Sequence, residues 1–99
     1  NPTMHLNLFL GINSLFFQGV MSPSWYNDID LWFNKYGFDE QVMLALFNYC
    51  YDNRALHRNY IQTVAEGWAS NNIKTFNDLD NYYEKQEKLR KNGFIDKPL

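Results

Sequence analysis

The 99-residue chain is 45% hydrophobic and 18% aromatic with only five Gly and three Pro, which excludes a disordered linker and predicts one folded domain. No apolar run reaches the roughly 18 residues of a membrane span, and the single cysteine, Cys50, excludes an internal disulfide, so we expect a soluble cytoplasmic protein. The formal net charge of −2 conceals an acidic first half, with five acids and one base in residues 1–53, and a basic second half, with eight bases and six acids in residues 54–99.

The first predicted helix covers an apolar run at residues 6–17 that ends near Gly19. Because most of this run is apolar, we expect its surroundings to be largely buried. Ser22 and Pro23 predict the start of a second helix, with Ser22 as the cap and Pro23 in the first helical position, where its missing N–H is not needed. The apolar stripe of this helix consists of Trp25, Ile29, Trp32, Phe33 and Tyr36. Gly37 ends it, because glycine tolerates the left-handed conformation found just past helix ends.

The third predicted helix follows Asp39, whose side chain can cap its first turn, with Phe38 placed to pack on Met43. Its inward-facing stripe consists of Val42, Met43, Leu46, Phe47 and Cys50. A polar break at residues 52–54 separates it from a fourth helix, which we expect to run from residue 57 or 58 to about residue 70.

The fourth predicted helix carries Tyr60, Val64 and Trp68 at four-residue spacing. Each four-residue step rotates by about 40°, so the three side chains span about 80° of one helix face. Aromatic residues at this spacing are typical of a helix face that packs into a core. By itself, the spacing therefore favours a structural stripe over a binding surface.

The fifth predicted helix begins at Thr75, because Thr75 and Asp78 have the spacing of a capping box, and it is expected to fray after Leu89. Together these elements predict an all-α fold, a compact bundle of about five short helices. We expect a single domain over residues 1–99 with a basic, frayed tail from about residue 85. Since the first residue is not Met, we interpret the chain as a segment excised from a longer protein.

The order of residues on the second to fifth helices resembles a known family. The stripe reads Tyr-x-x-x-Val-x-x-x-Trp and is followed by Asn71-Asn72-Ile73-Lys74-Thr75. Upstream, GVMSPSWYNDIDLWFNKYGFDEQVMLAL combines a Ser-Pro helix start, a tryptophan, a Tyr-Gly stop and an acidic cap. Over roughly residues 9–80, this order resembles the DnaD-like primosomal domain, the C-terminal domain of the bacterial DnaD and DnaB replication-initiation proteins and of phage replisome organisers. Val64 stands where isoleucine is commoner, a loss of one methylene that keeps packing similar.

The resemblance implies a helical domain without enzymatic activity that contributes DNA binding and helps load the replicative helicase. It assigns the family motif to Tyr60, Val64 and Trp68. We expect the DNA contacts next to this motif, at Lys74 and at the basic tail made of Lys85, Lys88, Arg90 and Lys91. The implied partners are single-stranded or remodelled DNA and replication initiator or helicase-loader proteins, and self-association stays open.

The basic tail has two interpretations. Lysines and arginines near phosphates release counterions, which gives sequence-independent and salt-sensitive binding, and aromatic rings can stack on unpaired bases. Alternatively, the tail is a solvated helix face in which Glu84 pairs with Lys88 and Glu87 pairs with Lys91. We expect the motif aromatics to be mainly structural, so that their removal would affect DNA binding through unfolding.

Enzymatic chemistry lacks the residues it needs. Cys50 and His57 have no second cysteine nearby to complete a zinc site, and His5 and His57 alone leave little for acid–base catalysis. No glycine-rich phosphate loop is present, so no catalytic residue, metal or cofactor is predicted. Two alternatives to a DNA-binding module remain: a protein-docking helical module whose acidic first half contacts a replication partner, and a helix-turn-helix regulator with residues 58–70 in a major groove. The second is disfavoured by the scarcity of base-reading side chains.

Overall fold

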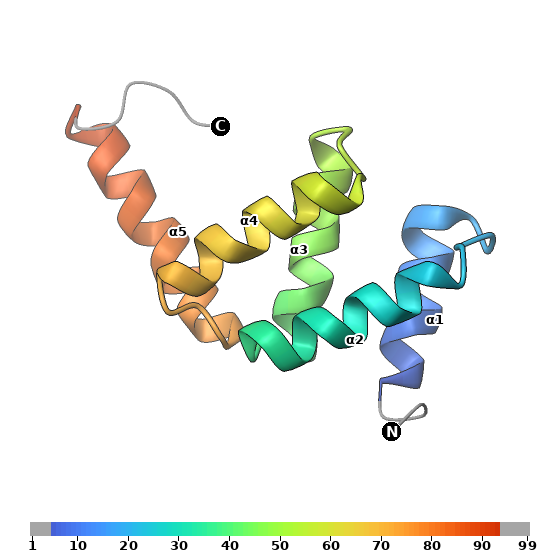
Figure 1. Ribbon diagram of the computed structural model, residues 1–99. Helices are drawn as coiled ribbons and strands as arrows, with labels where there is room; N and C mark the ends of the chain where they lie inside the picture. The colour runs from blue at the N-terminus through green and yellow to red at the C-terminus, as the bar shows by residue number, and fades with distance from the viewer. Residues whose placement is uncertain (1–4, 94–99) are drawn as a thin grey trace.

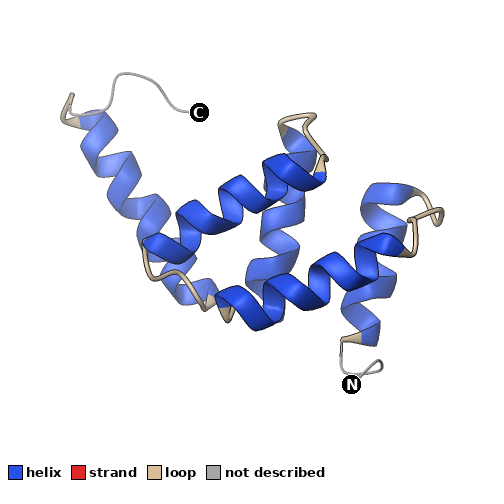
Figure 2. Cartoon of the chain, in the orientation of Figure 1, coloured by secondary structure: helices blue, strands red, loops and turns tan. Residues whose placement is uncertain are grey.

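The computed structural model describes residues 5–93, and within this part of the chain the fold consists of five helices without a strand (Figures 1 and 2). The helices are α1 (Leu6–Phe17), α2 (Ser24–Tyr36), α3 (Glu40–Asp52), α4 (Arg58–Ser70) and α5 (Phe76–Lys91). The all-α fold predicted from helical periodicity is confirmed. In Figure 1, α2 and α4 lie in front of α3, α1 lies at one edge, and α5 lies at the other.

The central helix of the bundle is α3, which packs against α1, α4 and α5. The stripe predicted for it is fully buried, and it consists of Val42, Met43, Leu46, Phe47 and Cys50. Trp32 of α2 is also fully buried, and its ring lies 6.2 Å from the ring of Phe47 between centroids. Burial of these side chains excludes water from the centre of the bundle and contributes to its hydrophobic stabilisation.

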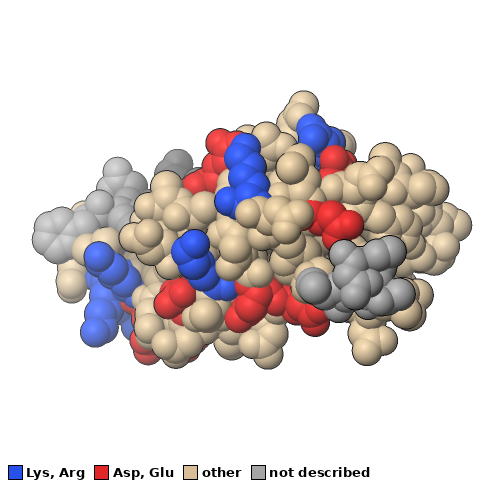
Figure 3. Space-filling model, turned by 60° about the horizontal axis from the view of Figure 1, so that its bottom comes forward, with Lys and Arg blue, Asp and Glu red and all other residues tan. Residues whose placement is uncertain are grey.

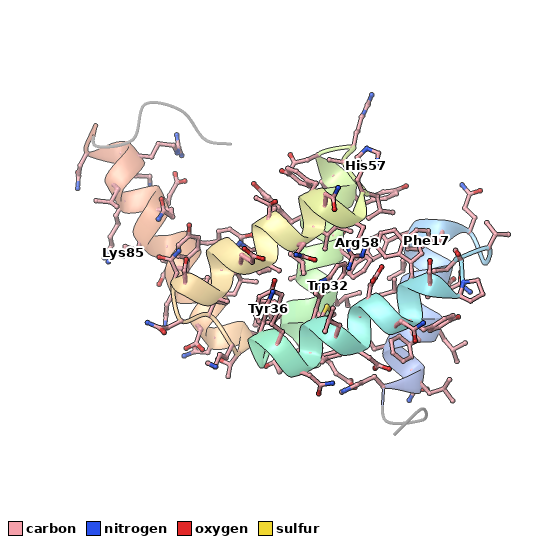
Figure 4. All side chains as sticks on the ribbon, in the orientation of Figure 1. Phe17, Trp32, Tyr36, His57, Arg58 and Lys85 are labelled. Carbon is pink, nitrogen blue, oxygen red and sulfur yellow. The ribbon has the colours of Figure 1, made fainter. Side chains whose placement is uncertain are left out.

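The neighbouring helices α2 and α4 run in the same direction (Figure 1). A regular series of polar contacts joins them, and Figure 4 labels three of the residues involved, Trp32, Tyr36 and Arg58. Each contact joins residues thirty positions apart, and successive contacts lie one turn further along both helices. The three contacts are Asp28 Oδ1 with Arg58 Nε at 2.9 Å, Trp32 Nε1 with Gln62 Oε1 at 3.4 Å, and Tyr36 Oη with Glu66 Oε1 at 3.2 Å. We call this series the α2–α4 contacts.

Helix ends follow the predicted caps at three places. Asp39 caps α3, since its Oδ1 accepts a hydrogen bond from the Val42 N–H at 2.8 Å. Gly37 ends α2 in the left-handed conformation with φ of +69°. Thr75 and Asp78 form the predicted capping box at the start of α5, with both reciprocal hydrogen bonds present.

The start of α2 differs from the prediction. The helix begins at Ser24, Pro23 occupies the cap position, and no side chain caps the helix. Instead, the backbone carbonyl of Ser22 accepts the Trp25 N–H at 3.0 Å, and that of Pro23 accepts the Tyr26 N–H at 3.1 Å. The prediction that the Ser22 side chain caps the helix is therefore wrong, because backbone carbonyls already satisfy these first amides.

Burial of α1 is only partial, so the expectation of largely buried surroundings is wrong. Leu8, Phe9 and Ile12 are buried, whereas Leu6, Leu10 and Leu15 are respectively 48%, 55% and 61% exposed. The helix lies at the edge of the bundle and packs on α3 by one face, which leaves the other apolar side chains facing outward. The apolar run therefore predicted the helix correctly, but it overestimated how many side chains of the helix are buried.

The last helix continues beyond the predicted point of fraying. It reaches Lys91 rather than ending after Leu89, and so the segment expected to be a frayed tail from about residue 85 is helical as far as residue 91. Leu79 is the buried residue of this helix, and Figure 1 shows that α5 diverges from the other helices toward its C-terminal end. The basic side chains are consequently held on a projecting helix instead of a loose segment.

Candidate nucleic-acid interface

The family motif lies on α4, where it joins this helix to its neighbours. The fully buried side chains of α4 are Ile61 and Ala65, and Trp68 is 6% exposed, whereas Tyr60 and Val64 are half-buried. Ile61 and Ala65 therefore lie at the centre of the inward face of α4. Of the motif residues, Trp68 is buried with them, whereas Tyr60 and Val64 lie at the margin of this face. Burial is also the main cause that raises the pKa of Tyr60 above its usual value.

Trp68 connects α4 with both α3 and α5. Its ring lies 6.1 Å from that of Tyr49 on α3 and 6.4 Å from that of Tyr83 on α5, in both cases edge to face. Partial burial raises the pKa of Tyr83 to about 12. This packing sets the position of α5 relative to the end of α4.

The turn after the motif brings the chain from α4 to α5. Asn71 Nδ2 donates to the Gly67 carbonyl at 2.8 Å and so satisfies one of the free carbonyls of the last turn. Asn72 adopts a left-handed conformation with φ of +60°, which asparagine tolerates better than most residues. The buried side chain of Ile73 then anchors the turn against the core. As a result, Asn71 and Asn72 stay exposed beside α5.

A polar groove lies between this turn and α5, with a volume of about 360 Å³. Its lining side chains are Asn71, Asn72, Asp78, Asn81, Tyr82, Lys85 and Gln86, and we call this surface the polar groove. It combines carboxamides that can donate and accept hydrogen bonds, one half-buried tyrosine ring, the Lys85 cation and the Asp78 carboxylate, so the formal charges of its lining cancel. The amides and the ring suit planar, hydrogen-bonding groups, and Lys85 can pair with an anionic one.

Only part of the predicted basic surface is assembled at the polar groove. Lys85 lines it, and Lys88 and Lys91 follow at three-residue steps that rotate by about 60° each around α5. Arg90 lies about 140° from Lys85 and pairs with Glu87 one turn earlier. The three lysines therefore form a stripe that starts at the groove and winds about 120° around α5, and Arg90 lies off this stripe.

The ion pairs on α5 differ from those in the alternative interpretation of the tail. Arg90 pairs with Glu87, and within the described residues neither Glu84 with Lys88 nor Glu87 with Lys91 forms a salt bridge. Lys85 and Lys88 are exposed. Figure 4 shows Lys85 on α5, away from the side chains labelled between α2 and α4.

Lys74, the remaining residue predicted to contact DNA, does not line the polar groove. Its Nζ is 3.3 Å from the position that a Cβ at Gly37 would occupy, at the C-terminal end of α2. The negative end of the helix dipole favours a cation there. Its backbone carbonyl accepts the Asp39 N–H at 2.8 Å, which fixes the α4–α5 turn beside the start of α3.

The electrostatic surface around these residues is mixed. On the face drawn in Figure 3, Lys and Arg side chains are interspersed with Asp and Glu. The polar groove itself contains Asp78, whose pKa is lowered mainly by hydrogen bonds from the backbone N–H groups of Thr75 and Lys74. This carboxylate is held at the positive end of α5, which reduces its repulsion of an anionic ligand.

The cysteine and the histidines lie outside the polar groove. No group of three or more His, Cys, Asp or Glu within residues 5–93 could hold a metal ion. Cys50 is buried, and burial raises the pKa of its thiol to about 11. His5 stacks on Phe33 with 4.0 Å between ring centroids and pairs with Glu40, so it links α1 to α2 and α3.

Sequence reasoning missed most of the polar groove. Asn81, Tyr82 and Gln86 were absent from the predicted site, although Tyr82 and Gln86 are four residues apart and so lie on one face of α5. The usable signal was the number of amide side chains near the α4–α5 turn: the exposed pair Asn71 and Asn72, followed by Asn81 and Gln86 on α5. A search restricted to basic residues does not detect it.

Comparison with models of known protein families identifies the family of this chain. The family model described as replication initiation and membrane attachment matches residues 12–83. The chain belongs to this family. The DnaD-like resemblance found from the motif is confirmed, and membership places the chain in replication initiation. No curated protein and no solved structure matches the chain.

The family match has a boundary that bears on the site. It includes α2, α3 and α4 and ends at Tyr83, so Lys85 and the lysine stripe beyond it lie outside the matched residues. The turn with Asn71 and Asn72 lies inside them. Although the family description mentions membrane attachment, no helix within residues 5–93 is long and apolar enough to cross a membrane.

Proposed function

We propose that this domain is a non-enzymatic DNA-binding module of replication initiation and that the polar groove is its contact surface for single-stranded or locally unpaired DNA. The observation that carries the proposal is the placement of Tyr82, Lys85 and four carboxamide side chains around one groove beside the family motif. Phosphates would lie along the stripe of Lys85, Lys88 and Lys91. Unpaired bases would reach the tyrosine ring and the carboxamides of the groove.

Each part of the groove has a separate task in this mechanism. The lysine stripe attracts the backbone without reading sequence, because it acts on phosphates alone. The ring of Tyr82 can stack on a base, a contact worth about 1 to 3 kcal/mol. The carboxamides can form hydrogen bonds with the edges of unpaired bases. This favours single strands or remodelled duplexes over intact duplexes.

The small number of cations sets the expected strength of binding. Three lysines contacting a single strand would give a salt slope of about −2, since each phosphate neutralised contributes about −0.7. Affinity is therefore expected to be modest for the isolated domain. Replication initiator or helicase-loader proteins that recruit the domain would raise its effective concentration at the DNA and so compensate for the modest affinity.

The proposal is tested by measuring fluorescence anisotropy of a labelled single-stranded oligonucleotide across a salt series. A double substitution, Lys85→Gln with Lys88→Gln, should weaken binding about tenfold at low salt and reduce the slope by about 1.4. The matched control, Lys35→Gln with Arg54→Gln, removes the same charge from exposed positions outside the groove. Substitutions are preferable to truncation after residue 84, because α5 extends to Lys91.

Equal binding by the two double variants would contradict the polar groove as the contact surface. A protein-docking module without DNA contact is the second candidate, favoured by the exposed apolar side chains of α1, Leu6 and Leu10. It predicts no saturable DNA binding at any salt concentration. In that case the wild type and both variants would be indistinguishable in the titration.

A further inference from the structure

A second and different groove lies on the opposite side of α5. One hollow of about 450 Å³ lies between α3 and α5, and another of about 320 Å³ lies between α1, α3 and the first residue of α5. The two hollows share Ala45, Asn48 and Phe76, so they form one continuous surface along the outer face of α3. We call this surface the apolar groove, and it has no lining residue in common with the polar groove.

Large apolar side chains are exposed along the apolar groove. Leu15 of α1 is 61% exposed, Phe76 at the start of α5 is 48% exposed, and Tyr83 is 45% exposed. Single exposed apolar residues are ordinary on protein surfaces, but a contiguous set in a hollow marks a site of interaction. Ala45 on α3 lies between them and, being small, leaves room for a side chain from another molecule.

The charge of the apolar groove is negative. Its charged lining residues are Asp52 and Asp80, and no lysine or arginine is among its described lining residues. Asp52 is the last residue of α3, where the free carbonyls of the helix end add partial negative charge. A ligand that fills this groove must therefore present apolar side chains together with positive ones.

We propose that the apolar groove binds an amphipathic α-helix of a partner protein, with apolar side chains on one face and lysine or arginine along its edge. The groove follows α3 from Gln41 to Asp52, which spans about 17 Å and matches about three turns of a docked helix. A helix laid into a hydrophobic groove is a common mode of recognition. This inference rests on the proposed function, since it specifies the chemistry of the protein partner in replication initiation.

The arrangement of α5 allows both ligands to bind together. Residues 78, 81, 82, 85 and 86 of this helix line the polar groove, whereas residues 76, 79, 80 and 83 line the apolar groove. Thus the same helix presents Lys85 toward DNA on one side and Asp80 toward a basic helix on the other. Binding of one ligand leaves the contact residues of the other uncovered.

The test uses two labelled 18-residue helical peptides, one made of leucine and lysine and one in which glutamate replaces every lysine. Fluorescence anisotropy with the full chain should detect binding of the lysine peptide, at least tenfold tighter than the glutamate peptide. Asp80→Lys and Phe76→Ala should each weaken the lysine peptide about tenfold. The control Asp30→Lys makes the same charge change at an exposed position of α2 and should change binding less than twofold.

Two further measurements keep the outcomes separate. Circular dichroism verifies that each variant is folded, and the oligonucleotide titration should be unchanged by Phe76→Ala, because Phe76 is outside the polar groove. Failure of DNA binding alone would overturn the proposed function, yet it would leave peptide binding measurable. Equal binding of the two peptides, or equal effects of Asp80→Lys and Asp30→Lys, would overturn the apolar groove as a site for a basic helix. Sedimentation that shows a dimer, and its dissociation by Phe76→Ala, would also overturn the proposal. In that case the apolar groove would bind a second copy of this chain.

Discussion

Asp39 accepts a hydrogen bond from the backbone N–H of Phe76 at 3.2 Å, across thirty-seven positions of the chain. Its other carboxylate oxygen accepts the Val42 N–H at 2.8 Å. One side chain therefore satisfies the first turn of α3 and the first turn of α5. This double contact holds the start of α5, and with it both grooves, against the beginning of the central helix.

Replacing Asp39 should destabilise the domain more than loss of an ordinary cap. An Asp39→Ala variant leaves free amides at two helix starts, and we expect a loss of about 2 kcal/mol in the free energy of unfolding, at the upper end for one cap. Urea denaturation followed by circular dichroism measures this change. Asp30→Ala, which removes an exposed acid from α2, should stay within about 0.5 kcal/mol of the wild type.

Two glycines should respond to alanine with opposite signs. Gly37 has φ of +69°, and a Cβ there would lie 3.3 Å from Lys74 Nζ, so Gly37→Ala should destabilise the domain by about 1 kcal/mol. Gly67 lies within α4, and a Cβ there meets no atom within 4 Å, so Gly67→Ala should stabilise it by about 0.5 to 1 kcal/mol. Thermal unfolding of both variants checks the signs, and a shift in the same direction for both would refute the assignment.

Trp68 and Tyr82 should separate stability from binding. Because Trp68 joins three helices, Trp68→Ala should lower the free energy of unfolding by about 3 to 5 kcal/mol and lose DNA binding only as the domain unfolds. Tyr82→Leu retains apolar packing but removes the stacking ring, so it should weaken binding by about 1 to 3 kcal/mol with little change in stability. Denaturation curves and oligonucleotide titrations on the same samples distinguish the two effects. A Tyr82→Leu variant that binds normally would remove this ring from the contact surface.

The pH dependence of stability should contain a contribution from Asp78. Backbone hydrogen bonds lower its pKa from the usual 3.8 in the folded state, so the folded protein favours the carboxylate. The resulting stabilisation is complete above the unfolded pKa and is lost as the pH falls through the lower folded value. Wild type should therefore be more stable than Asp78→Asn at pH 7, and the difference should shrink below about pH 4. A difference that grows on acidification would have the wrong sign.

Helix boundaries were predictable where a local chemical signal determines them. The carboxylate of Asp39, the left-handed Gly37 and the capping box at Thr75 act over three or four residues, and the structure confirms each one. Ser22 failed for an equally local reason, because backbone carbonyls took the role expected of its hydroxyl. Short-range competition of this kind is hard to resolve from residue types alone.

The grooves are harder to predict than the helix ends, because their shape depends on how the helices pack against one another. Asn72 and Gln86 line one groove, and the angle of α5 that brings them there is set in part by Trp68, which packs against both α3 and α5. Likewise, Leu15 is apolar and was expected to be buried, but its exposure depends on which side of α3 receives α1. Periodicity specifies which residues share a helix face, whereas the orientation of that face is decided by the packing of the whole bundle.

The α2–α4 contacts also restrict sliding between these two parallel helices. A slip of one turn, about 5.4 Å, would place Gln62 opposite Asp28 and leave Arg58 without its carboxylate partner. Such a slip would carry Asn71 and Asn72 along the molecule by the same length, and the polar groove would lose one wall. The pairing of Asp28 with Arg58 at the beginning of α4 therefore fixes the position of α4 along α2. By doing so it also determines where the C-terminal end of α4 meets α5.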